Sequence, residues 1–124
     1  MNNLNKPTFT KYDWGSEIIW SLTDNYMAKT IEINPYKTNN LLVYEKKEKS
    51  IIIIANTLIL GIGDCCNEDE LDYLELQEGW SQYIAPGKMH RYGATDKFVR
   101  LIEISSPELD DGIVISPEEE LLWT

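Results

Sequence analysis

The chain of 124 residues contains one histidine, and its neighbours give that residue a defined place. His90 ends the segment Pro86-Gly-Lys-Met-His90, in which a proline-glycine turn precedes a β-rich run. An imidazole can ligate a transition metal or transfer a proton near neutral pH. A single imidazole cannot hold a first-row metal tightly, because such metals need several nitrogen or carboxylate ligands. His90 therefore indicates a candidate site without deciding its chemistry.

The other groups of reactive or charged side chains predict no site. Cys65 and Cys66 are adjacent, in a stretch rich in glycine, aspartate and asparagine, so they cannot cross-link distant strands. Acidic residues gather in residues 67–72 and in the tail from Glu108 to Glu120. Runs of like charge are typical of solvated loops and edges, and we assign no ion to them.

Composition argues against two classes of partner. The net charge of −10 and the pI of about 4.4 oppose binding to a phosphate backbone, because a polyanion is repelled at long range. The longest apolar stretch, residues 51–55, is far too short to span a membrane, and the first residues lack the pattern of a signal peptide. We therefore expect a cytoplasmic protein with no nucleic-acid or membrane partner.

Short β-rich runs separated by turn residues recur along the chain, and helical periodicity is almost absent. This pattern is typical of an antiparallel sandwich or barrel. The length and the 43% of hydrophobic residues suit one core rather than two, so we expect a single domain over residues 1–124. The expected strands span residues 17–22, 26–33, 41–45, 50–55, 57–61, 71–76, 80–84, 89–93 and 98–104, with a further edge at Val114-Ile115.

The segment around His90 resembles the second motif of the cupin superfamily. In that motif a glycine opens a strand, a Pro-Gly turn reverses the chain, and a histidine points into a β-barrel as a metal ligand. Gly79, Pro86, Gly87 and His90 match these positions. The resemblance implies an all-β cupin fold, which is a jelly-roll-like antiparallel barrel (a double-stranded β-helix). It places the core at about residues 11–111 and an acidic C-terminal tail at residues 112–124.

The chain also resembles the first cupin motif, but in spacing alone. Every metal ligand of that motif is replaced by another type of residue. Leu42 has no donor atom, the phenol of Tyr44 loses its proton only near about pH 10, and Lys49 adds positive charge where a cation would lie. A shorter spacing, which the motif also allows, would put Glu48 in the place of Lys49 and still leave only two ligands. The resemblance thus implies a degenerate site with no metal and no other cofactor. The motif positions for glycine, two ligands, glutamate and glycine are occupied by Tyr36, Leu42, Tyr44, Lys49 and Asn56.

The flanking segments are similar to the cupin domain of bacterial type II phosphomannose isomerase and mannose-phosphate guanylyltransferase enzymes. The similar segments are Trp14-Gly-Ser-Glu17, Tyr26-Met-Ala-Lys29 and residues 100–110. The resemblance therefore covers nearly the whole chain.

In the family register, Tyr44, Lys49 and His90 point into the barrel. One interpretation is a pocket in which a phenol, an ammonium and an imidazole bind a small anionic or hydroxylated ligand, such as a sugar or a sugar phosphate. A buried ammonium needs a partner, and Glu103, which the resemblance also turns inward, is the natural candidate. The other interpretation is structural: Lys49 reaches solvent, Tyr44 fills space and His90 is a hydrogen-bonded core residue. The candidate ligand-binding residues are Tyr44, Lys49, His90 and Glu103.

Several functions stay open. The first is a metal-free cupin that serves as a binding or structural module for a small, carbohydrate-like molecule. The second is an isomerase or epimerase of a sugar phosphate, with His90 as base and Tyr44 as acid. A third is a scaffold whose acidic tail contacts a partner. Arg91 and Arg100 could bind phosphate at the rim or simply pair with surface carboxylates.

The apolar run from Ile51 to Ile54 is continuous rather than alternating. Continuous apolar runs are typical of strands that are covered on both faces. We therefore expect a homodimer in which a second copy covers the outer face of this strand.

Overall fold

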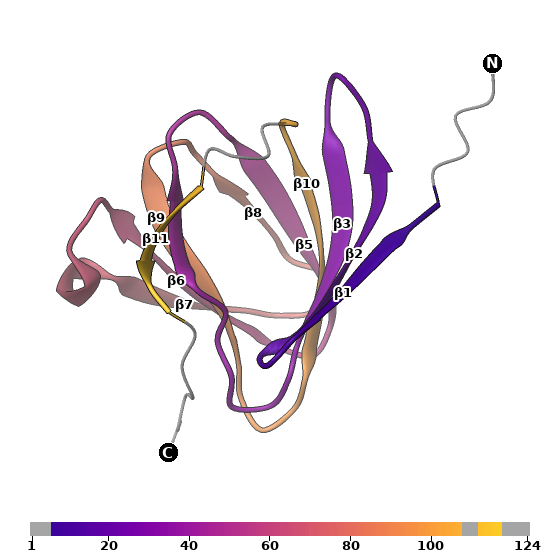
Figure 1. Cartoon of the computed structure of the whole chain (residues 1–124). Coiled ribbons are helices and arrows are strands. Elements are labelled where there is room, and N and C mark those ends of the chain that lie inside the picture. Colours follow the sequence, from indigo (N-terminus) through magenta and orange to yellow (C-terminus); the bar gives the residue numbers. More distant parts are fainter. Residues whose placement is uncertain (1–5, 108–111, 118–124) are drawn as a thin grey trace.

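Two antiparallel sheets face each other across the core, as Figure 1 shows. The computed structural model describes residues 6–107 and 112–117. One sheet has six strands in the order β1-β2-β3-β10-β5-β8, and the other has five in the order β11-β4-β9-β6-β7. The six-stranded sheet contains β1 (Thr8–Tyr12), β2 (Gly15–Leu22), β3 (Met27–Ile33), β5 (Lys49–Ala55), β8 (Ser81–Ile84) and β10 (Val99–Ser105). The five-stranded sheet contains β4 (Leu41–Tyr44), β6 (Leu58–Asp64), β7 (Asp72–Leu76), β9 (Lys88–Ala94) and β11 (Gly112–Ser116).

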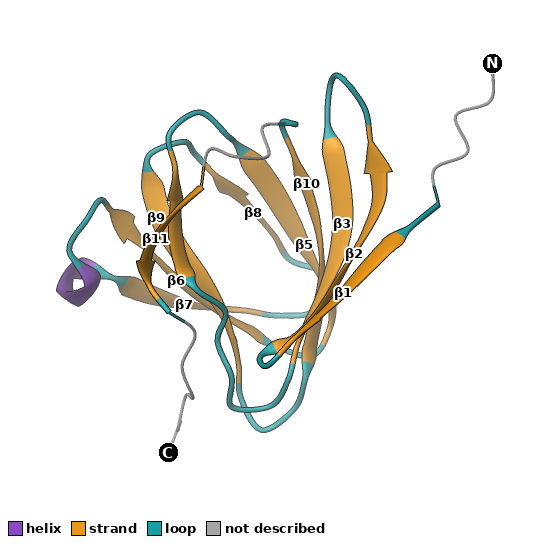
Figure 2. Cartoon of the chain, in the orientation of Figure 1, coloured by secondary structure: helices purple, strands orange, loops and turns teal. Residues whose placement is uncertain are grey.

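The expected all-β fold is confirmed. Each strand expected from the sequence is present, and its expected bounds agree with the observed ones to within a few residues. Figure 2 shows strands and loops throughout, with one short 3-10 helix, η1 (Glu68–Glu70). Strand β1 was not expected. No described helix is long and apolar enough to cross a membrane.

The expectation of a closed barrel is corrected. Among the described residues no strand ladder joins the two sheets, so the structure is an open pair of facing sheets. A barrel and a pair of facing sheets need the same alternation of inward and outward side chains. The sequence pattern could therefore not distinguish between them.

Strand β5 shows how alternation builds the core. Ile51 and Ile53 point inward and are buried, whereas Ile52 and Ile54 point outward and are half exposed. The inward residues join a cluster of isoleucine, leucine and valine side chains from both sheets. The apolar run from Ile51 to Ile54 thus has one buried face and one face exposed to solvent.

A second, smaller apolar cluster lies on the outer side of the five-stranded sheet. It is formed by Leu41, Val43, Leu71 and Met89, with Ile115 packed against it. Strand β11 supplies Ile115 and pairs with β4, which confirms the edge expected at Val114-Ile115. Part of the expected acidic tail is therefore a strand, while residues 108–111 and 118–124 lie outside the described residues.

The two positions that the first cupin motif gives to glycine have a left-handed backbone in this chain. Tyr36 and Asn56, which occupy the two glycine positions, have φ angles of 62° and 64°. Residues other than glycine rarely adopt this left-handed region, because the Cβ atom crowds the backbone. The agreement of both positions supports the register assigned from the sequence.

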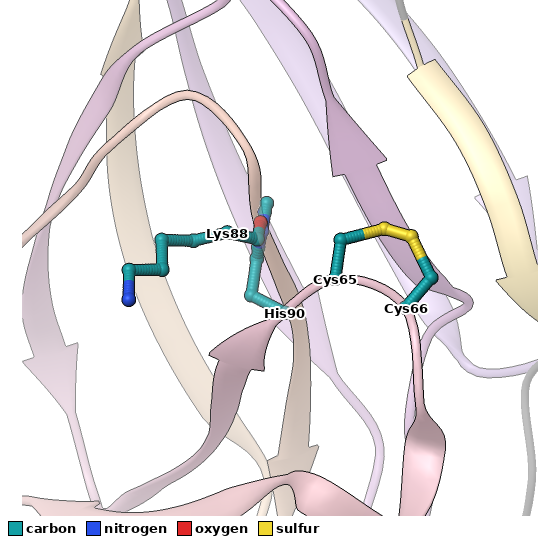
Figure 3. The surroundings of a disulfide bond; sticks show 4 residues. All are labelled: Cys65, Cys66, Lys88 and His90. Carbon is teal, nitrogen blue, oxygen red and sulfur yellow. A yellow bond between two sulfur atoms is a disulfide. The ribbon is translucent and has the colours of Figure 1, made fainter.

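Cys65 and Cys66 form a disulfide between adjacent residues. Figure 3 shows the pair in the loop after β6, near Lys88 and His90 of β9. Because the two residues are neighbours in sequence, the bond links no distant strands, as the sequence indicated.

Candidate ligand pocket between the sheets

A cavity of about 570 Å³ lies between the two sheets. Inward side chains of β2, β3, β4, β5, β9 and β10 line it, and residues at the end of β1 also contribute. Apolar side chains such as Leu42 and Ile31 alternate in its wall with several charged groups. An apolar concavity with convergent polar groups is the default location of a small-molecule site.

The structure brings all four candidate residues to this cavity: Tyr44, Lys49, His90 and Glu103 each line it. The Lys49 ammonium lies 3.0 Å from Glu103 Oε1 and 4.6 Å from the centre of the Tyr44 ring. The Tyr44 and His90 rings are 6.0 Å apart, centre to centre. Their convergence agrees with the register that the sequence suggested, and their role in ligand binding stays a prediction.

Strand β5 decides whether Glu48 or Lys49 takes the inward position that the resemblance gives to the motif glutamate. Lys49 is the first residue of β5 and is buried, whereas Glu48 is exposed. Lys49 therefore stands in the place of the motif glutamate. The structural interpretation, in which Lys49 reaches solvent, is not what the structure shows.

Glu103 is the centre of a buried polar network. Its carboxylate accepts hydrogen bonds from Lys49 Nζ at 3.0 Å and from Tyr92 Oη at 2.5 Å, and Lys29 Nζ lies at 3.5 Å. Lys29 also donates to Glu17 at 3.1 Å. Two ammonium groups and two carboxylates thus balance each other in the wall of the cavity.

Burial and charge act in opposite directions on the ionisable groups of this network. Burial alone would raise the pKa of Glu103, but the charges of Lys49 and Lys29 outweigh it and hold that pKa well below its ordinary value. Burial lowers the pKa of Lys49, although Glu103 opposes this effect. Burial, together with the charge of Glu103, raises the pKa of Tyr92 well above its ordinary value.

His90 presents an unused hydrogen-bond acceptor. Its Nδ1 lies 3.1 Å from the carbonyl oxygen of Lys88, so we assign the ring proton to Nδ1. The other nitrogen, Nε2, is buried and has no hydrogen-bond partner among the described residues. Burial, aided by the charge of Lys49, lowers the pKa of His90 to about 3. The ring is therefore neutral at physiological pH, with a free lone pair on Nε2.

An aromatic pair that the sequence did not reveal stands at the end of β1 and contributes to the lining of the cavity. The rings of Tyr12 and Trp14 stack with their centres 4.6 Å apart and an angle of 8° between their planes. The Tyr12 hydroxyl donates to Glu17 at 3.3 Å. Trp14 is buried, whereas Tyr12 is about one-third exposed at 38%.

Sequence reasoning also missed the other polar residues of the wall. Lys29 alternates with Ile31 and Ile33 on one face of β3, and that alternation was a usable signal that it points inward. Tyr12 carried no comparable alternation signal, because its strand is mostly exposed. The missed lining residues include Tyr12, Glu17, Lys29, Lys47 and Tyr92.

The residues present do not fit the divalent metal that the cupin motif would hold. Leu42 lies opposite His90 in the β4–β9 pairing and has no donor atom. The Lys49 ammonium, already bound to Glu103, would repel a cation. No group of three or more histidine, cysteine, aspartate or glutamate residues suited to a metal occurs in the described part of the chain.

Arg91 and Arg100 do not line the cavity. Arg91 is buried on the outer side of its sheet, where Nη2 donates to the carbonyl oxygen of Pro117 at 2.8 Å. Arg100 lies on the outer side of the other sheet and pairs with Glu32 at 3.3 Å. The expected alternative, pairing with surface carboxylates, describes both residues, because Arg91 Nη1 also lies 3.6 Å from Oε1 of the exposed Glu68.

The fold is similar to that of solved cupin structures. The chain matches the capsular polysaccharide assembling protein CapF from Staphylococcus aureus with a TM-score of 0.74 and 13% identity, over 90% of this chain and 34% of CapF. It matches KdgF from Halomonas sp. with a TM-score of 0.69 and 14% identity, over 90% of this chain and 95% of KdgF. For a cupin-2 domain from Rhodospirillum rubrum the TM-score is 0.73 and the identity 10%, over 87% and 74% of the two chains.

These matches confirm the expected cupin fold and, at such low identity, show the fold alone. The chain spans about one third of the length of CapF. No protein-family model matches the sequence, and no curated protein matches it either. The finer resemblance to phosphomannose isomerase stays a prediction.

Proposed function

We propose that this cupin-fold chain works without a metal and binds a small, hydroxyl-rich molecule of the carbohydrate class in the cavity between its sheets. The observation that carries this proposal is the unpartnered Nε2 of His90, beside ammonium groups in the wall of the same cavity. A buried acceptor without a partner costs about 1–3 kcal/mol. A ligand hydroxyl that donates to Nε2 would recover that free energy.

The charges of the cavity favour a neutral or weakly charged ligand. Three carboxylates and three ammonium groups line it within the described residues, so their formal charges cancel. This balanced set offers both donors and acceptors, which suits hydroxyl groups because each can donate and accept. The six residues are Asp13, Glu17, Lys29, Lys47, Lys49 and Glu103.

The aromatic pair supports the same class of ligand. A Tyr12 ring backed by Trp14 offers a flat apolar surface next to the Glu17 carboxylate. The C–H face of a sugar ring can pack on such a surface while its hydroxyls reach polar neighbours. CapF, a capsular polysaccharide assembling protein, shares this fold, which is consistent with carbohydrate chemistry on it.

Binding is favoured over the alternative of a sugar-phosphate isomerase. A general base works best with a pKa near the operating pH. The pKa of His90 is about 3, and that of Glu103 is well below its ordinary value, so both are weak bases at neutral pH. Neither Arg91 nor Arg100 lines the cavity to hold a phosphate, and the three ammonium groups that do line it are balanced by three carboxylates. A cytoplasmic location remains part of the proposal.

The test is a ligand-observed NMR screen of neutral aldoses, uronic acids and sugar phosphates, followed by calorimetry on the hits. We expect binding of a neutral sugar or uronic acid that weakens at least about tenfold in His90→Phe, which keeps the ring and removes the acceptor. Tyr83→Phe is the matched control, because Tyr83 is exposed on the outer side of the sheet.

Two outcomes would contradict the proposal. One is the absence of millimolar or tighter binding by every compound in the screen. The other is equal affinity in His90→Phe and the control. Conversion of a sugar phosphate during the screen, lost in His90→Phe, would instead support the isomerase.

A further inference from the structure

The outer face of the six-stranded sheet carries two neighbouring rows of uncharged side chains, which we call the outer patch. Cross-strand pairing places six residues in one row and five in the next. The first row is Phe9, Ile18, Thr30, Ile102, Ile52 and Ser81, and the second is Ser21, Ala28, Ile104, Ser50 and Tyr83. We propose that two copies of this chain associate through the outer patch.

The distribution of charge points to this face. The chain carries 32 charged residues, from 11 basic and 21 acidic ones, yet one row crosses six strands and the next crosses five without a charged residue. Two copies with a net charge of −10 each repel wherever carboxylates meet. The patch lets them approach without bringing acid against acid. Glu32 and Arg100 flank the patch. They form an ion pair with 3.3 Å between Arg100 Nη2 and Glu32 Oε1, so their charges balance.

The size of the outer patch fits within a standard protein–protein interface. Six strands at the usual spacing span about 24 Å, and two rows of side chains extend about 14 Å along the strands. The resulting area is roughly 350 Å². It is uncharged rather than wholly apolar, because it includes the hydroxyl side chains of Ser21, Thr30, Ser50 and Ser81. With a polar rim it fits within the roughly 800 Å² that each partner buries in a standard interface.

The relief of the outer patch favours a second copy over an unrelated protein. Ile52, Ile104 and Tyr83 project, with 39%, 41% and 51% of their surface exposed. They stand beside small side chains, namely Ser50, Ser81 and Ala28, the last of which is fully covered. A face with both ridges and hollows can be complementary to itself about a two-fold axis, as a symmetric dimer requires.

The test measures self-association of the full chain by sedimentation equilibrium from about 1 to about 200 µM, the range of weak to moderate interfaces. We expect a dimer with a micromolar Kd, weakened at least about tenfold in Ile52→Lys and again in Ile104→Lys. Each added lysine makes the chain less acidic, so a loss of association cannot come from a larger net charge on the two copies. The control is Ile113→Lys, on β11 of the other sheet, where the side chain is 60% exposed.

A wild-type chain that stays monomeric at about 200 µM overturns the proposal and leaves the face to a different protein. Equal weakening by the Ile113 control also overturns it. Thermal unfolding verifies that the variants are folded, because both positions already contact solvent. If Ile52→Lys unfolds, Ile52→Ser replaces it, and the same weakening is expected.

Discussion

Lys49 and Glu103 form a buried ion pair whose geometry follows from strand register. Lys49 lies opposite Ser105, and Glu103 lies opposite Ile51, so the two side chains are diagonal neighbours on the inner face of adjacent strands. Their charged atoms are 3.0 Å apart, and both side chains are almost fully buried. The two residues differ in their further partners. Glu103 also contacts Lys29 and Tyr92, whereas Lys49 has Glu103 as its carboxylate partner within the described residues.

The first prediction concerns this asymmetry. Glu103→Gln should lower the free energy of unfolding by about 3–5 kcal/mol, because it leaves the Lys49 ammonium buried without a carboxylate. Lys49→Met should cost less, since Glu103 keeps Lys29 and Tyr92. Urea unfolding of the two variants and the wild type checks the order. A larger loss in Lys49→Met would contradict it.

The second prediction is a dependence of stability on pH that His90 causes. The folded pKa of His90 is about 3, below the ordinary 6.5, so the unfolded chain binds this proton first as pH falls. Stability is therefore full above about pH 6.5 and decreases by about 1.4 kcal/mol per pH unit below it. Wild type should lose roughly 2 kcal/mol more than His90→Phe between about pH 6.5 and pH 5. Parallel losses in urea titrations would contradict this.

The third prediction concerns the left-handed backbone at Tyr36. Tyr36→Gly should stabilise the fold by roughly 0.5–1 kcal/mol, because the left-handed strain of a non-glycine residue exceeds the entropy that glycine loses. The backbone N–H of Tyr36 still donates to Thr95 O at 2.8 Å. Asn56→Gly is the comparison and should gain nothing, because the Asn56 amide donates to Phe98 O at 2.8 Å. Thermal and urea unfolding measure both changes.

The fourth prediction concerns Cys65 and Cys66. Replacing both with serine should change the free energy of unfolding by less than about 0.5 kcal/mol, because a bond between neighbours closes no long loop. Both residues are exposed, so their removal opens no cavity in the core. A loss of several kcal/mol under oxidising conditions would show that this loop stabilises the fold in another way.

The fifth prediction tests the aromatic surface. Tyr12→Ala should weaken a bound sugar by about tenfold, the scale of one stacking contact. Phe9→Ala is the matched control, because Phe9 belongs to the same strand and points to the outer face with 62% of its surface exposed. Equal effects of the two substitutions on affinity would remove Tyr12 from the binding site.

The strands of this fold could be predicted because the signals for strands and turns are local. In β5 the β-branched run from Ile51 to Ile54 is followed by Asn56, which marks the next turn. Strand β1 could not be predicted because Phe9 and Tyr12 lie among polar residues at the edge of the six-stranded sheet. An edge strand that is mostly exposed has little hydrophobic signal to distinguish it from a loop.

The sequence by itself determined the all-β fold, because strand and turn signals depend on residue types at short, regular spacings. The cupin register, and with it the replacement of the metal ligands, rests on the resemblance of two short motifs. Tertiary structure alone decided that the sheets stay open and that Lys29 and Tyr92 join Lys49 around Glu103. The pairing of Lys49 with Glu103 was expected from the resemblance, and the structure confirms it. Tertiary structure also left Nε2 of His90 unpartnered among the described residues. Such contacts depend on which strands become neighbours, and the free energy of a buried charge depends on partners far away in sequence.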